Sequence, residues 1–207
     1  MAKRVVILDY GSGNLRSAER AVARVGADVE VTDDLGRAAR ADGLVVPGVG
    51  AYAACMAGIE TLSAGPMIAE RVRTGAPVLG ICVGMQILFD AGEEHGVVTK
   101  GLGLAPGTVT RLHAPVVPHM GWNTVTWPGG SVLGAGLPDD TRFFFVHSYA
   151  STVTDAQTEA GVRVATAVHG EQFVAAFETE VLRATQFHPE KSGDAGATLL
   201  ANWLGTL

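Results

Sequence analysis

Residues 78–86 read VLGICVGMQ, an apolar run that ends in a cysteine with one glycine two positions before it and another two positions after it. Gly80 and Gly84 permit a sharp turn from a strand into a helix, because a Cβ at either position would clash. Such a turn places Cys82 at the carboxyl edge of a parallel sheet and at a helix N-terminus, which favours the thiolate. The pattern predicts an elbow of the G-x-nucleophile-x-G type, with Cys82 as the nucleophile and the amide of Val83 as an oxyanion donor.

The residues before this elbow alternate short apolar runs with stretches of helical spacing. Near-continuous apolar strands separated by helices are typical of a parallel sheet that helices cover on both faces. We expect strands at residues 4–8, 28–31, 43–46 and 77–81. We expect helices at residues 14–25, at 51–73 with a break near Gly65-Pro66, and at 84–90.

Beyond about residue 100 the pattern changes to short strands bounded by turns, many of them antiparallel. These strands are expected at residues 107–112, 142–146, 162–168, 173–177 and 181–187, and a helix at 193–207 closes the chain. A length of 207 residues suits one domain. The sequence therefore predicts a single α/β domain over residues 1–207, with a mostly parallel central sheet and a smaller antiparallel β region.

Composition and charge argue against several classes of protein. A net charge of −6 disfavours nucleic-acid binding, which usually needs a basic surface. No apolar run approaches the roughly 18 residues of a membrane span, and the N-terminal residues are expected to form a strand, not a signal peptide. Cys55 and Cys82 form no CxxC pair, so we expect a reducing, cytoplasmic compartment. No HExxH or clustered acid motif occurs, so we expect no metal and no cofactor.

A thiol nucleophile needs a base, and the base needs a group that orients it. Residues 185–190 read TQFHPE, in which Pro189 favours an extended backbone at His188. Positions i and i+2 of an extended segment share a face, so Glu190 can hold the imidazole of His188 in one tautomer. Alone, this segment is equally well explained as a solvated turn, but together with the elbow it favours a Cys-His-Glu triad.

Two further glycine-rich loops follow apolar strands. Residues 45–50 read VVPGVG and lie at the same expected sheet edge as the nucleophile. The amide of Val49, in a loop freed by Gly48 and Gly50, is a candidate second oxyanion donor, and a plain βα turn is the alternative. Residues 9–16 read DYGSGNLR, a degraded GxGxxG that leaves open a nucleotide-binding or purely structural subunit.

Several other residues have a plain structural interpretation. Cys55 lies in an apolar helix without special flanks, as a buried structural cysteine does. Trp122 is by default a core residue, although exposure would mark it as an interface residue. His169 is isolated in the sequence and is expected at the surface, and residues 143–146, which read FFFV, are most simply a core strand.

Over residues 5–192 the chain resembles the class I (triad) glutamine amidotransferases, whose fold is flavodoxin-like. The resemblance rests on the stretches GICVGMQ, HPE, YGSGNLRS, PGVG, PHMGWN and FVHSY. It implies that Cys82 attacks the side-chain amide of L-glutamine to form a γ-glutamyl thioester, that His188 transfers protons and that Glu190 orients His188. It also implies that the Gly48–Val49 peptide must flip before the oxyanion loop is competent.

The same resemblance implies a pocket for the glutamine substrate. Its lining residues would be Gln86, Glu94, His147, Ser148 and Tyr149. Glu94 is placed by its distance from the nucleophile along GMQILFDAGEE. The family usually has SEE there, and this chain departs from it because Gly92 replaces the serine.

The motifs PHMGWN and FVHSY resemble most the branch of the family that works in histidine biosynthesis as a heterodimer with a (β/α)8-barrel cyclase subunit. The resemblance implies that ammonia passes into that barrel. The candidate interface residues are Asn14, Met120, Trp122 and Lys191. Two alternatives stay open: a glutaminase for another synthase, such as one that makes pyridoxal phosphate, and a cysteine hydrolase that releases no ammonia from glutamine.

Overall fold

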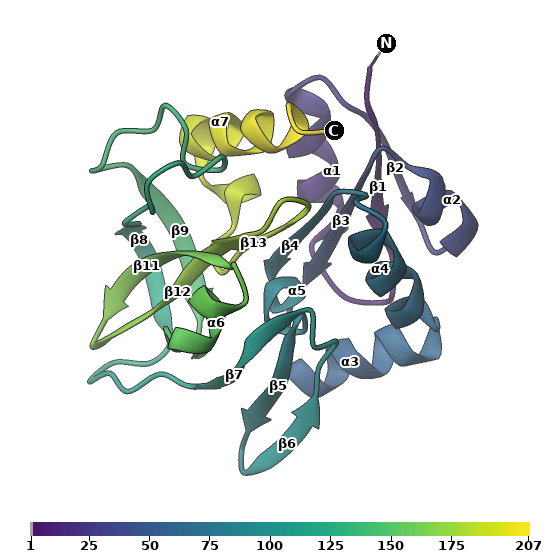
Figure 1. Ribbon diagram of the computed structural model, residues 1–207. Coiled ribbons are helices and arrows are strands. Elements are labelled where there is room, and N and C mark those ends of the chain that lie inside the picture. The colour runs from purple at the N-terminus through teal and green to yellow at the C-terminus, as the bar shows by residue number, and fades with distance from the viewer. Residues whose placement is uncertain (1) are drawn as a thin grey trace.

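The computed structural model describes residues 2–207 and is built around a seven-stranded sheet of order β11-β12-β13-β4-β3-β1-β2 (Figure 1). The strands of this sheet are β1 (Arg4–Leu8), β2 (Asp28–Thr32), β3 (Gly43–Gly48), β4 (Val78–Cys82), β11 (Arg163–His169), β12 (Glu171–Glu178) and β13 (Leu182–Thr185). A second, four-stranded sheet contains β5 (Phe89–Glu94), β6 (Val97–Lys100), β7 (Ala105–Arg111) and β10 (Tyr149–Ser151). A third sheet pairs β8 (His119–Thr124) with β9 (Arg142–His147). The helices are α1 (Leu15–Arg24), α2 (Leu35–Arg40), α3 (Tyr52–Thr61), α4 (Ala64–Arg73), α5 (Val83–Gln86), α6 (Asp155–Glu159), the 3-10 helix η1 (Pro189–Lys191) and α7 (Gly193–Leu204).

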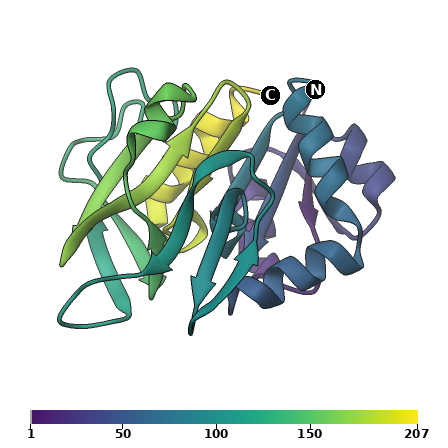
Figure 2. The same ribbon diagram turned by 60° about the horizontal axis from the view of Figure 1, so that its bottom comes forward.

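The predicted α/β architecture is confirmed. Strands β2, β1, β3, β4 and β13 run parallel, and β12 and β11 extend the sheet in antiparallel pairing. The apolar runs of β1, β3 and β4 are buried almost throughout, as expected of strands covered on both faces. Helices α1 and α7 pack together on one face, and α2, α3 and α4 cover the other (Figure 1). In the turned view, the teal strands β5–β7 stand in front of the central sheet (Figure 2).

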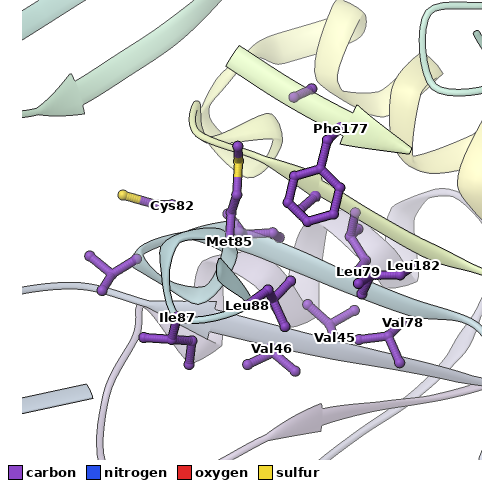
Figure 3. Packing of buried hydrophobic residues seen from close by; sticks show 14 of the residues in the cluster. Val45, Val46, Val78, Leu79, Cys82, Met85, Ile87, Leu88, Phe177 and Leu182 are labelled. Carbon is purple, nitrogen blue, oxygen red and sulfur yellow. The ribbon is translucent and has the colours of Figure 1, made fainter. Parts of the chain in front are cut away.

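The elbow between β4 and α5 depends on close backbone approaches. A Cβ on Gly84 would lie 1.9 Å from the carbonyl oxygen of Val46, and a Cβ on Gly80 would lie 2.9 Å from the carbonyl oxygen of Gly84. Cys82 itself has a φ of +58°, a left-handed conformation that costs a side-chain-bearing residue energy and often marks a functional site. Its sulfur points away from the apolar side chains that pack around β4, such as Leu79 (Figure 3).

The predicted helix at residues 84–90 is wrong in its second half. Helix α5 ends at Gln86, and Phe89 already begins strand β5. The reason is tertiary: Phe89 is buried and pairs with Ala105 of β7, a contact that local spacing does not reveal. Strands β5 and β6 therefore form a hairpin over residues for which the sequence predicted no strand.

The long helix expected over residues 51–73 is interrupted earlier than predicted. Helix α3 ends at Thr61, and Ser63 takes a left-handed backbone with a φ of +57° before α4 begins. Pro66 lies in the first turn of α4, where its missing N–H has no helical partner to lose. Within residues 2–207, no helix combines the length and the apolar character that crossing a bilayer requires.

Candidate active site

The structure brings His188 and Glu190 together beside Cys82. His188 follows β13, which pairs in parallel with β4 and so ends at the same sheet edge as Cys82. Its backbone N–H donates to the carbonyl of Phe144 (2.9 Å), and its carbonyl accepts from the hydroxyl of Ser192 (2.7 Å). Its Nδ1 lies 2.7 Å from Glu190 Oε1, and both side chains are almost fully buried. The imidazole is thus fixed in place and in orientation.

The surroundings of His188 favour its protonated form. Burial by itself lowers the pKa of His188, but hydrogen bonds to Cys82 and Glu190, together with the negative charges of both, raise it to about 9. Because Nδ1 is engaged by Glu190, Nε2 is the nitrogen left for the sulfur. The pair can therefore hold a thiolate next to an imidazolium at neutral pH, the arrangement that cysteine acyl transfer requires.

A pocket of about 210 Å³ opens in front of the sulfur. It brings together the nucleophile, the histidine, the glycine-rich loop after β3 and all five residues predicted to bind glutamine. Its lining residues are Val49, Gly50, Cys82, Val83, Gln86, Glu94, Val146, His147, Ser148, Tyr149, His188 and Lys191. Lys191, predicted for a partner interface, thus lies at the pocket, and Val146 is a lining residue that the sequence did not indicate.

Glu94 reaches the pocket from the end of β5, in the hairpin β5–β6. Its Oε2 accepts a hydrogen bond from the backbone N–H of Tyr52 at the start of α3 (3.0 Å). Gly92 stands where the family usually has a serine, and the packing around it explains this difference. A Cβ on Gly92 would lie 2.4 Å from the ring of Tyr52, so the close packing of β5 on α3 excludes a serine.

In the loop after β3, the backbone N–H of Val49 is bonded to Ser12 and not to a group at Cys82. The N–H of Val49 donates to Ser12 Oγ (3.2 Å), and the carbonyl of Val49 accepts from Ser12 Oγ (2.9 Å) and from Cys55 Sγ (3.4 Å). A Cβ on Gly48 would lie 2.4 Å from the backbone nitrogen of Gly84, so this loop and the elbow are in direct contact. In this conformation the N–H of Val49 is engaged by Ser12.

Two of the contacts that hold this loop were not found from the sequence. Ser12 belongs to the first glycine loop, whose pattern suggested a nucleotide site and gave no sign of a bond to Val49. Cys55 is buried, as expected, and burial is the main cause that raises the pKa of its thiol. Its thiol nevertheless touches Ser12 Oγ (3.2 Å), a contact for which sequence spacing offers no signal.

The remaining interface candidates lie outside the pocket. On β8, Met120 and Trp122 are 69% and 54% exposed, so the default assignment of Trp122 to the core is wrong. Successive residues of a strand alternate between faces, and β8 turns these two outward while His119 points inward. Asn14 lies before α1 and lines a small cavity together with Glu190.

Three histidines, His119, His147 and His169, form a cluster that the sequence did not predict. His169, expected to be isolated, stacks on His119 with ring centroids 4.2 Å apart. His119 Nδ1 lies 2.9 Å from His147 Nε2, which links β8 to a residue of the pocket. Across residues 2–207, no group of three or more histidine, cysteine, aspartate or glutamate side chains is arranged to hold a metal ion.

Comparisons with known proteins agree with this geometry. The family model described as Glutamine amidotransferase class-I matches residues 6–206. A relative from Thermobifida fusca (strain YX) is 60% identical over 211 residues, covering 100% of both chains. Another, from Mycobacterium tuberculosis (strain CDC 1551 / Oshkosh), is 61% identical over 206 residues, covering 100% of this chain and 99% of the relative. Both are named imidazole glycerol phosphate synthase subunit HisH.

Among solved structures, PurLQS from Thermotoga maritima has a similar fold. The TM-score is 0.72 at 18% sequence identity, and the match covers 99% of each chain. At this identity the likeness concerns the fold alone. The confirmed fold is thus a large, mostly parallel sheet with flanking helices and a smaller β region, as the sequence predicts.

Proposed function

The chain belongs to the class-I glutamine amidotransferase family, and we propose that it is the glutaminase subunit of imidazole glycerol phosphate synthase. The subunit assignment is supported by relatives of that name that are about 60% identical over the whole chain. One geometric observation carries the chemistry: Cys82 and the His188–Glu190 pair meet at a single pocket with the GMQ and HSY segments. The whole chain, residues 1–207, acts as one glutaminase domain.

The first half of the reaction forms a thioester. The thiolate of Cys82 attacks the side-chain amide carbon of L-glutamine, and the carbon–nitrogen bond breaks as His188 Nε2 gives its proton to the departing ammonia. The γ-glutamyl group stays on the sulfur. Gln86, Glu94 and the segment 147–149 line the pocket in which the amino-acid end of the substrate is held.

The second half releases glutamate. His188 takes a proton from a water molecule, the hydroxide attacks the thioester carbon, and the carbon–sulfur bond breaks to give L-glutamate and the free thiolate. Glu190 accepts a hydrogen bond from Nδ1 throughout, which holds the tautomer and stabilises the imidazolium. One glutamine and one water thus give one glutamate and one ammonia.

The negative oxygen of each tetrahedral intermediate needs donors. The amide of Val83, the first helical residue after the nucleophile, is one of them. The amide of Val49 is the second once the Gly48–Val49 peptide turns, with Gly50 giving the loop its freedom. Since Val49 donates to Ser12 in the present conformation, the isolated chain has low activity, and futile hydrolysis of glutamine is prevented.

The partner is the (β/α)8-barrel cyclase subunit HisF, in a heterodimer. Ammonia enters that barrel, sheltered from water, and the complex makes imidazole glycerol phosphate and AICAR in histidine biosynthesis. The exposed Met120 and Trp122 support a protein interface on β8, and Asn14 and Lys191 contribute at the sheet edge. Two free cysteines fit a cytoplasmic setting.

Ammonia release from L-glutamine, with and without the cyclase subunit and its nucleotide ligand, tests this function. We expect a very low rate from the isolated chain, a many-fold increase in the complex, and no release by Cys82→Ala in either state. A high basal rate that the cyclase does not change would contradict the subunit assignment. No release in the complex would contradict glutaminase chemistry and favour a different cysteine hydrolase.

A further inference from the structure

One backbone carbonyl determines the direction of a buried hydrogen-bond chain. The carbonyl of Tyr149 accepts from Gln86 Nε2 at 2.9 Å and lies 3.0 Å from His147 Nδ1. A carbonyl oxygen can only accept, so both neighbours must present an N–H to it. This requirement fixes the amide orientation of Gln86 and the tautomer of His147, which are otherwise ambiguous for such side chains.

On one side of the Tyr149 carbonyl, the hydrogen-bond chain leads to Cys82. The amide nitrogen of Gln86 also donates to Gln186 Oε1 (2.9 Å). With its oxygen engaged there, Gln186 turns its Nε2 toward the sulfur of Cys82, 3.8 Å away, a distance within reach for a bond to sulfur. Gln86 and Gln186 are both buried, so solvent offers neither amide an alternative partner.

On the other side, the chain leads to strand β8. Because His147 Nδ1 carries its proton, His147 Nε2 is an acceptor, and His119 Nδ1–H donates to it (2.9 Å). His119 Nε2 is then an acceptor for Asn123 Nδ2 (3.3 Å), which also donates to the carbonyl of Val168 (2.9 Å). Burial lowers the pKa of His119 to about 4 and that of His147 to about 3, so both rings are neutral at pH 7 and keep this pattern.

We propose that Gln186 is a further catalytic residue, whose amide N–H stabilises the Cys82 thiolate. The Tyr149 carbonyl orients the amide of Gln86, and Gln86 in turn holds Gln186 in the orientation that does so. A flipped amide would turn its oxygen to the sulfur and repel the thiolate, which is why the orientation matters. Unlike His188, this donor does not titrate, so it acts at every pH.

This inference rests on the proposed function in taking Cys82 as the nucleophile, but it can be tested without glutamine. Gln186→Met keeps the length of the side chain and removes the donor. Gln157→Met is the matched control, because Gln157 is equally buried but lies outside this hydrogen-bond network, donating to the carbonyls of Pro106 and Thr152. The readout is alkylation of Cys82 by iodoacetamide, followed by mass spectrometry of its peptide between pH 5 and pH 10.

We expect Gln186→Met to slow alkylation of Cys82 at pH 7 about tenfold and to move the midpoint of the pH dependence upward, since a hydrogen bond to a charged group is worth at least that factor. Gln157→Met should alkylate at the wild-type rate. Gln186→Glu keeps the shape and the bond from Gln86 but puts an oxygen at the sulfur. The alkylation rate of Cys82 should fall at least as far in Gln186→Glu as in Gln186→Met. Gln186→Glu becomes the test variant if Gln186→Met does not fold.

In the complex with the cyclase, kcat should fall about tenfold in Gln186→Met while KM stays within about threefold, because the bond is made to the nucleophile and not to the substrate. Wild-type alkylation in a folded Gln186→Met and Gln186→Glu would overturn the proposal. So would an equal loss in Gln157→Met, which would indicate a general packing effect. The two proposals can also be separated. If the wild-type protein had no glutaminase activity but Gln186→Met still slowed alkylation of Cys82, the proposed function would be refuted and the role of Gln186 supported.

Discussion

Two buried cysteines occupy different kinds of site in this chain. Cys82 is 4% exposed and Cys55 is fully buried, so burial does not distinguish them. Cys82 has a left-handed backbone at the start of a helix, faces a pocket and lies beside a histidine that keeps its proton. Cys55 lies inside α3, and its thiol contacts neutral groups, the hydroxyl of Ser12 and the carbonyl of Val49.

Backbone geometry and neighbouring charge, not exposure, therefore distinguish the two thiols. The elbow directs the sulfur of Cys82 away from the core, and hydrogen bonds to Cys82 and Glu190 help to raise the pKa of His188 to about 9. In the α3 region burial raises the pKa of the Cys55 thiol, which keeps that thiol neutral.

Replacing each cysteine by alanine separates the two roles most strongly. We expect Cys82→Ala to lower the glutaminase rate of the complex by at least about 10⁴-fold, because the covalent route is lost. Cys55→Ala should keep the rate of the complex within about threefold. The measurement is ammonia release by the two complexes, with folding checked by circular dichroism. Equal losses in the two variants would refute the contrast.

Glu190→Gln weakens the charge that distinguishes the Cys82 site. We expect kcat to fall about 10³-fold, since a triad histidine loses its orienting carboxylate. The pKa of His188 is raised from 6.5 to about 9, so its proton and the stability it contributes are fully present below pH 6.5 and are lost as pH rises through about 9. The alkaline limb of the kcat profile should therefore lie near pH 9 and move lower in Glu190→Gln. An unmoved limb would show that Glu190 does not act through His188.

Gly84→Ala tests whether the elbow depends on close backbone approach. A Cβ there would meet the carbonyl of Val46, and we expect a loss of about 3 kcal/mol in the free energy of unfolding, or about 6–12 °C in Tm. Gly129→Ala is the matched control, because nothing lies within 4 Å of a Cβ at that position. Thermal unfolding of the two variants gives the comparison. A Gly84→Ala protein as stable as the control would contradict the account of the elbow.

Ser12→Ala loosens the contact between the Cys55 region and the oxyanion loop. Without Ser12 Oγ, the Val49 amide loses the partner that turns it from the sulfur, and we expect the basal rate of the isolated chain to rise about fivefold. The rate of the stimulated complex should change little. Ser17→Ala, on helix α1, is the control for a lost hydroxyl. An unchanged or lower basal rate in Ser12→Ala would mean that this bond does not restrain the loop.

The elbow and the central sheet are predictable from sequence because their signals are local. The glycines around Cys82 and the apolar runs of the parallel strands each lie within a few residues of the feature they specify. The end of α5 is not predictable in this way, because Phe89 joins a strand through its pairing with Ala105. Tertiary pairing decides there between helix and strand.

The same distinction between local signals and long-range contacts applies to the candidate site. His188 and Glu190 are two residues apart and do form the predicted hydrogen bond, but Glu190 lies in the 3-10 helix Pro189–Lys191, so the extended segment predicted beyond His188 is wrong. Gln86 and Gln186 are a hundred residues apart, and only their shared network with the Tyr149 carbonyl determines which atom faces the sulfur. One local signal for Gln186 was present: it lies two positions before His188, on the same face of an extended segment.

Covalent trapping tests most directly whether Cys82 attacks glutamine. The complex with the cyclase is treated with 6-diazo-5-oxo-norleucine, an electrophilic glutamine analogue, and both cysteine peptides are measured by mass spectrometry. We predict one equivalent of label on Cys82, none on Cys55, and protection by excess L-glutamine. Label on Cys55, or an unlabelled Cys82 in the assembled complex, would contradict the account.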